Sequence, residues 1–442
     1  MTNYTRIFIL FLLTVSASGA MAQSAATTSS PYSRYGLGDY DPALMPQTRA
    51  MGSIATAINR ISGYNNINVL NPASYGAINL TTIDVGIYSN VVSLSQSGQT
   101  GSTNANFRLS HVAFAIPVTH KSALSFGLLP YTEMGYNYKQ TLKTGYGTGS
   151  PVDTNAVNYV YQGDGGLSKA YLGYGFGLGK HLLIGANISY IFGNLIQTSS
   201  TEIPSLYGTL NSRVQSSNSI NGFNYDYGVQ YSFDFTEFKH LVLGYSASTA
   251  SSLNNTNTYI VSQYTYDSSG NENVAADSVI SRTGTKTKIK LPQINHFGVS
   301  YQSDGKFLLG ADYTIGNWSS LTISGANAGF QNSKTVNVGG QITPNSSSTH
   351  NYFARVDYRF GAIYDDTYLS LNNTTIKKYA LTFGFGLPLA PSQNLTSFYK
   401  INFSAELGQR GTLTNGLVKE NYVNLHLGFT LNDKWFQKYK FE

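Results

Sequence analysis

The stretch Phe223-Asn-Tyr-Asp-Tyr-Gly-Val-Gln-Tyr-Ser-Phe-Asp-Phe235 alternates strictly between two kinds of side chain. Every odd position is aromatic or Val, and every even position is Asn, Asp, Gly, Gln or Ser. Successive residues of a β-strand point to opposite faces, so this strand has one apolar and one water-facing surface. It is longer than the usual strand of about five or six residues and long enough to cross a membrane at a tilt.

The same alternation recurs along most of the chain from Ile83 onward. Near the C-terminus, Val423, Leu425, Leu427 and Phe429 alternate with polar or small residues. Candidate strands lie near 81–95, 106–119, 122–138, 167–178, 182–199, 217–235, 239–259, 285–302, 305–318, 350–364, 376–388, 398–410 and 420–432. Bacterial single-chain barrels have an even number of strands, so one more is expected near 155–162 or 329–342. The prediction is an all-β, antiparallel transmembrane barrel of fourteen strands, with twelve as the alternative.

The composition supports a membrane barrel. Charged residues make up only 11% of the chain, against about 25% in soluble proteins. Tyr (34) and Gly (44) are abundant, and Trp (2) is rare. A soluble β-sandwich or a secreted adhesin also alternates, but the long strands bordered by aromatic residues favour an outer-membrane barrel. Hydrophilic stretches at 96–105, 143–156, 200–216, 260–284 and 343–350 are expected to be long extracellular loops.

The first residues predict export. Arg6 precedes an apolar run from Ile7 to Val15, and Ala20-Met21-Ala22 provides small residues for cleavage. Residues 1–22 are therefore interpreted as a signal peptide, and a buried N-terminal helix is the alternative. The chain contains no cysteine, which rules out disulfides and thiol metal sites. The predicted location is the outer membrane.

A segment without strand periodicity precedes the first predicted strand. Residues 23–80 are rich in Gly and Asn and end near Asn71-Pro72-Ala73, whereas residues 81–442 form the predicted barrel. A compact segment at this place suggests a plug, or hatch, inside the lumen. Asn71 is expected to cap the turn, Pro72 to fix φ, and Ala73 to allow close backbone approach. The alternative is that the tripeptide only begins the first strand.

The residues Gly52-x-x-Ala55-x-Ala57, Asn71-Pro72-Ala73 and Leu291-Pro292 resemble motifs of the FadL/TodX family of outer-membrane transporters. Ser30-Pro-Tyr-Ser-Arg-Tyr-Gly-Leu-Gly-Asp39 and Glu406-Leu-Gly-Gln-Arg-Gly-Thr412 resemble its Bacteroidetes branch. The resemblance covers essentially the whole mature chain. It implies a fourteen-stranded barrel with an N-terminal hatch, a route for long-chain fatty acids or other hydrophobic molecules, and lateral exit through a gap at the third strand.

Pro130 lies inside the predicted third strand, followed by Gly135. Proline cannot donate a ladder hydrogen bond and is normally excluded from central strands. The hypothesis is that Pro130 to Gly135 forms the lateral gap, and the alternative is a bulge at the membrane interface.

Charged residues on the predicted inward faces either line a path or pin the hatch by ion pairs, and pinning is the favoured role. They are Asp84, Arg108, Asp226, Asp312, Arg355, Asp357, Arg359 and Glu406. Arg355 and Arg359 could instead receive a ligand carboxylate. No His spacing indicates a metal site and no nucleophile elbow is present, so neither a cofactor nor enzyme activity is expected.

Three functions remain open from sequence. The first is a channel for hydrophobic small molecules, the second a non-transporting accessory barrel of a protein secretion or assembly complex, and the third a permanently closed surface barrel. The expected partners are the lipid bilayer and lipopolysaccharide, with either a hydrophobic ligand or other complex subunits. The small net charge argues against nucleic acid.

Overall fold

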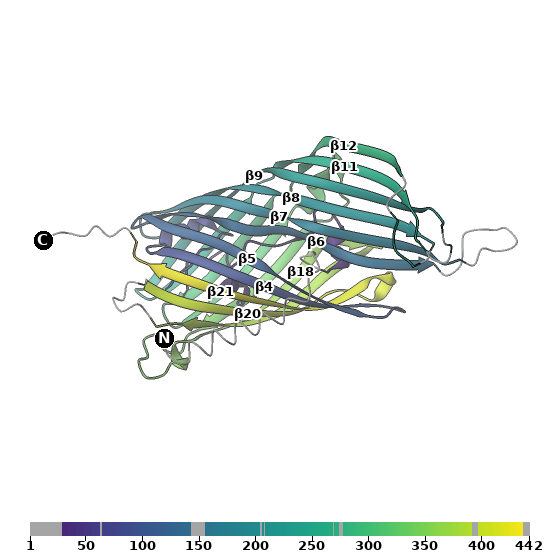
Figure 1. Cartoon of the computed structure of the whole chain (residues 1–442). Coiled ribbons are helices and arrows are strands. Elements are labelled where there is room, and N and C mark those ends of the chain that lie inside the picture. The colour runs from purple at the N-terminus through teal and green to yellow at the C-terminus, as the bar shows by residue number, and fades with distance from the viewer. Residues whose placement is uncertain are drawn as a thin grey trace, which may run out of the picture.

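A computed structural model describes residues 29–61, 64–142, 155–203, 206, 208–267, 269–273, 277–390 and 397–435. The predicted signal peptide lies outside these residues. The wall of the molecule is a single antiparallel sheet (Figure 1). Its strands are β4 (Thr81–Gln96), β5 (Ser102–Thr119), β6 (Ser122–Leu142), β7 (Val157–Leu178), β8 (Leu182–Glu202), β9 (Asn211–Thr236), β10 (Lys239–Ser248), β11 (Ser252–Tyr264), β12 (Asp277–Lys290), β13 (Ile294–Ser303), β14 (Phe307–Gly316), β17 (Ser333–Ile342), β18 (Asp357–Leu371), β19 (Thr374–Pro388), β20 (Ser397–Gly411) and β21 (Val418–Asp433).

The sheet closes into a barrel of fourteen strands, as predicted. The last strand, β21, pairs with the first wall strand, β4, over their whole lengths. β10 and β11 both pair with β9 and form one interrupted wall strand, and β12 and β13 form the next, with Pro292 in its interruption. The missing strand is β17, in the predicted region 329–342, whereas residues 157–162 extend β7.

The two faces of the wall differ as the sequence alternation predicts. In β9, Phe223, Tyr225 and Phe233 are exposed, whereas Asn224, Asp226 and Gln230 are buried. Exposed apolar side chains continue around the barrel on β4, β8, β13, β17 and β21, which gives the exterior an apolar band that suits lipid. The polar faces point into the lumen, so the chain is a transmembrane barrel of the outer membrane. Among the described residues, no helix is long and apolar enough to span a membrane.

The connection between β17 and β18 differs from the prediction. Because β17 runs toward the end that carries the tight turns at 120–121 and 179–181, residues 343–356 lie at that end and are not an extracellular loop. The predicted strand from residue 350 begins only at Asp357, because Phe353–Arg355 form a 3₁₀ turn, η5.

The described N-terminal residues Ser29–Leu80, here called the plug, contact the inward faces of the wall strands. Their elements are short: η2 (Pro31–Arg34), β1 (Asp39–Tyr40), α2 (Pro46–Arg49), β2 (Arg60–Ile61), β3 (Tyr64–Asn65) and η3 (Pro72–Ala77). Met51, Ile54 and Ile58 pack with the wall residue Leu308 in one buried cluster. The plug therefore owes its position to the barrel that surrounds it.

Candidate functional site

Asn71-Pro72-Ala73 begins η3, which packs against the inward faces of β7, β8 and β9. The Asn71 side chain accepts a hydrogen bond from the Ala73 amide (3.1 Å) and donates one to the Thr56 carbonyl (2.6 Å). A Cβ at Gly185 of β8 would collide with the Pro72 carbonyl, so glycine at this position allows the backbones of the wall and the plug to approach closely. The tripeptide thus locks the turn and links it to the neighbouring loop of the plug.

A second plug loop, around Gly52–Ala57, is held by polar side chains of the wall. One carboxylate oxygen of Asp312 (β14) accepts from the amides of Ala55 (2.7 Å) and Thr56 (2.8 Å) and from the Thr56 hydroxyl (2.8 Å). The Gly52 amide donates to the hydroxyl of Thr382 on β19 (2.8 Å). Gly52 has a φ of +68°, a conformation that favours glycine. This part of the plug is fixed by directed hydrogen bonds.

The wall itself is incomplete between β5 and β6. The two strands pair only from Thr119↔Ser122 to Val112↔Leu128, and within the described chain no residue of β6 beyond Leu128 pairs with β5. β5 continues in register with β4 to Ser102, and β6 continues with β7 to Leu142, so the two strands diverge (Figure 1). Pro130 lies just past the last ladder pair, and the β6–β7 register shifts between Pro130 and Thr132.

The strap, defined as residues Ser33–Asp41 of the plug, covers the edge of β6 that β5 has left. Within the strap, β1 pairs with β6 through Asp39↔Glu133 and Tyr40↔Thr132. The Asp41 amide donates to the Tyr131 carbonyl (3.0 Å). The Ser33 hydroxyl accepts from the Gly135 amide (3.0 Å) and donates to the Gly135 carbonyl (3.1 Å). The strap therefore takes the place of a wall strand along this edge.

Four charged side chains join the strap to both sides of the gap. Arg49 and Arg108 contact Asp41 at 2.5 and 3.1 Å, and Arg108 also pairs with Glu133 of β6. Burial raises the pKa of Asp41, but the two guanidinium groups outweigh it and hold that pKa below its usual range. Arg108 comes from β5 and Glu133 from β6, so the network spans the gap.

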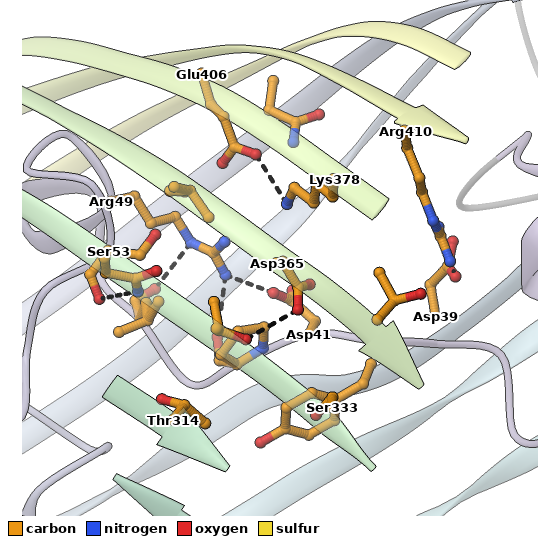
Figure 2. Close-up of a pocket in the computed structure, with 18 of the residues that line it drawn as sticks. Asp39, Asp41, Arg49, Ser53, Thr314, Ser333, Asp365, Lys378, Glu406 and Arg410 are labelled. Atoms are coloured by element: carbon orange, nitrogen blue, oxygen red, sulfur yellow. Dashed lines mark hydrogen bonds and ion pairs between the residues drawn. The ribbon is translucent and has the colours of Figure 1, made fainter. Parts of the chain in front are cut away.

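The network borders a lumen cavity of about 270 Å³ (Figure 2). Most of the residues that line it are of polar or charged types, and ion pairs join Glu406 to Lys378 (2.9 Å) and Asp39 to Arg410 (2.9 Å). Arg108 and Glu133 also line it, so the cavity reaches the gap. No set of three His, Asp or Glu in the described chain is placed to hold a metal ion.

Arg355 and Arg359 do not form the carboxylate-binding pair considered from sequence. Arg359 is fully buried, and it donates to Gln341 (2.7 Å), Asn402 (2.8 Å) and Asp357 (3.0 Å). Arg355 belongs to η5, outside β18, and its guanidinium carbon lies over the Tyr352 ring, 5.4 Å from the ring centroid. The alternating pattern placed both on one strand, but the strand begins after Arg355.

The structure adds three residues that the sequence analysis did not select: Asp41, Arg49 and Glu133. Asp41 and Arg49 lie in a segment without strand periodicity, so no pattern indicated which way they point. Glu133 lies on the predicted third strand, where a charge just past Pro130 was an available signal. Of the predicted inward charges, Arg108 and Asp312 do contact the plug.

The closed fourteen-stranded barrel matches the fold of FadL-type outer-membrane barrels. Solved structures with this fold include the toluene transporter TbuX of Ralstonia pickettii (14% identity, 88% of this chain and 98% of that chain, TM-score 0.55). The toluene transporter TodX of P. putida has the same fold, with 14% identity, a TM-score of 0.56 and coverage of 88% of this chain and 98% of that chain. A Pseudomonas aeruginosa FadL homologue has it too, with 12% identity, a TM-score of 0.55 and coverage of 90% of this chain and 100% of that chain. At these identities the likeness concerns the fold.

The family model of BamG matches residues 4–442. The chain therefore belongs to the BamG family. None of the curated proteins matches it.

Proposed function

We propose that the protein is a non-enzymatic outer-membrane channel in which a small hydrophobic or amphipathic molecule leaves the lumen sideways, between β5 and β6. The observation that carries this proposal is the loss of the β5–β6 ladder beyond Leu128, at the height where the lumen cavity lies. The likeness in fold to toluene transporters agrees with it. Pro130 and Gly135 border the gap, and Asn71, Pro72 and Ala73 hold the plug below it.

The strap would have to move for passage. It covers the β6 side of the gap through backbone pairs and bridges to β5 through the Asp41–Arg108–Glu133 side-chain contacts, and these contacts are fewer than those of a full wall strand. The polar lining of the cavity favours molecules with a polar group, such as a fatty acid, over pure hydrocarbons.

A reversible tether tests the channel. Tyr40→Cys with Thr132→Cys joins a register pair of β1 and β6, where the expected Cα separation suits a disulfide. Uptake of labelled oleate and of toluene by cells carrying this variant should fall on oxidation and return on reduction. The control is Arg60→Cys with Asn65→Cys, a register pair inside the plug that ties nothing to the wall. Equal uptake by the oxidised and reduced tether would contradict the channel.

The second candidate is a non-transporting accessory barrel in an outer-membrane protein secretion or assembly complex. Two observations favour it: the match to the BamG family, and a plug held by hydrogen bonds and ion pairs with a largely polar lumen. Affinity purification of the tagged protein in mild detergent should then yield stoichiometric partner proteins. Oxidation of the Tyr40→Cys/Thr132→Cys tether should leave that complex intact. Purification of the barrel alone would count against this candidate.

A further inference from the structure

The edge of β5 that faces the gap remains uncovered. Residues 102–109 of β5 pair with β4 on one side, and Ser110 lies in a bulge of that ladder. On the other side, no main-chain hydrogen bond reaches them from any described residue, because β6 has diverged and the strap pairs with β6 instead. Ser29 and Arg108 provide only side-chain contacts there. This stretch is here called the open edge.

Residues 105–109 of the open edge lie at membrane depth. The register across β4 shows this depth. Leu109 pairs with Ile87 of β4, which in turn pairs with the apolar Leu427 of β21. In the same way, Ala105 pairs with Val91, and Val91 pairs with Val423 of β21. Lipid tails cannot hydrogen-bond to a strand edge, so open sheet edges are not found against the hydrocarbon of a membrane. A strand edge at this depth needs a hydrogen-bonding neighbour.

From Ala105 to Ser110, the side chains of the open edge alternate between exposed and less exposed positions. Phe107 is 69% exposed and Leu109 52% exposed, and both point to the lipid side, whereas Asn106 and Ser110 are buried. The nine residues from 102 to 110 are long enough to pair with a strand of the usual length of about five or six residues. The opposite edge, on β6, already accepts strand-like pairing from β1.

We propose that the open edge accepts an added antiparallel β-strand from a partner protein, with apolar and polar residues in alternation like a strand of another outer-membrane barrel. Main-chain hydrogen bonds would supply the attraction, and the alternation would place apolar residues beside Phe107 and Leu109. This proposal rests on the second candidate function, that of an accessory barrel, and names the open edge of β5 as the site where the barrel binds a strand of its partner.

The chain has no cysteine, so single-cysteine variants give an unambiguous test in the full-length protein in lipid nanodiscs. The probe is a synthetic peptide that copies Tyr422–Asn432, with cysteine in place of Leu427. Phe107→Cys should capture this peptide as a disulfide. The matched control is Leu427→Cys, an outward-facing position (42% exposed) on β21, which is paired on both sides.

Register separates strand addition from apolar contact. A set of peptides that carry the cysteine at successive positions is tested against Phe107→Cys and against Leu109→Cys. The cysteine position that is captured best should differ by two residues between the two protein variants, in the direction that antiparallel pairing requires. A peptide of the same composition without alternation should be captured no better than at the control position. Equal capture at Leu427→Cys, equal capture of the scrambled peptide, or no register shift would overturn the proposal. Capture requires no partner complex, so its failure is distinct from failure to co-purify partners.

Discussion

At the scale of single residues, Asp312 holds the plug by accepting three hydrogen bonds from Ala55 and Thr56. Asp312→Ala leaves the Ala55 and Thr56 amides without their acceptor, and a buried unsatisfied group costs about 1–3 kcal/mol. We expect faster hydrogen exchange in residues 51–58, measured by mass spectrometry. Asp312→Asn retains an acceptor oxygen and should have a smaller effect. Unchanged exchange in Asp312→Ala would contradict this role.

The sequence predicted half of this contact. Strand alternation places Asp312 on the inward face of β14, and the structure agrees. Its partners could not be inferred, because the loop Gly52–Ala57 has no periodic pattern and is positioned by the wall around it. Asn71 was recognised as a turn cap because its hydrogen bond to Ala73 is local, whereas its bond to Thr56 is not.

At the scale of elements, the strap should respond to acid through Asp41. Because the folded pKa of Asp41 is depressed, its stabilising effect is fully present above the unfolded pKa, about 4, and is lost as the pH falls through the lower folded value. Strap docking should therefore stay constant from neutral pH down to about 5 and weaken only under strong acid.

The fluorescence of Trp318 reports whether the strap is docked, because the ring centroids of Trp318 and of Tyr40 in the strap are 5.6 Å apart. With Trp435→Phe, Trp318 is the single tryptophan, and its emission should shift only below about pH 4. Asp41→Asn should show the shifted emission at neutral pH. A transition near pH 6 to 7 would assign the response to another group.

The break in the wall was predictable, but its cover was not. Pro130 signals a disturbed ladder because it cannot donate a hydrogen bond, and the β6–β7 register does shift beside it. The sequence does not show where β5 and β6 diverge. The strap contains no alternating stretch long enough to predict that it pairs with β6.

At the scale of the whole molecule, we expect the plug to close the lumen, because its residues are buried against the inward faces of the wall. Deletion of residues 31–70 removes the strap and the Gly52–Ala57 loop and leaves the wall strands and their seam intact. In planar bilayers the deleted form should show large, steady ion conductance, whereas the full chain should show little. A folded deletion variant that stays silent would show that the wall closes the lumen by itself.

The overall barrel was the most predictable part, because each strand carries its own alternating pattern. The count of fourteen followed from the even-number rule, and β17 lay in one of the two expected places. The prediction of an extracellular loop at 343–350 is wrong because it rests on polar composition alone. The direction of the preceding strand decides at which end of the barrel a connection lies, and that direction depends on the number of strands before it.

The seam between β4 and β21 sets an order of events during biogenesis. It joins residues 81–96 to residues 418–433, so the ring can close only after the last strand has been delivered. The plug is synthesised before the wall, and its hydrogen bonds to wall residues such as Asp312 and Thr382 can form only once those strands are in place. Such long-range pairing is slow, and a truncation before β21 should therefore yield a chain for proteolysis instead of a smaller barrel.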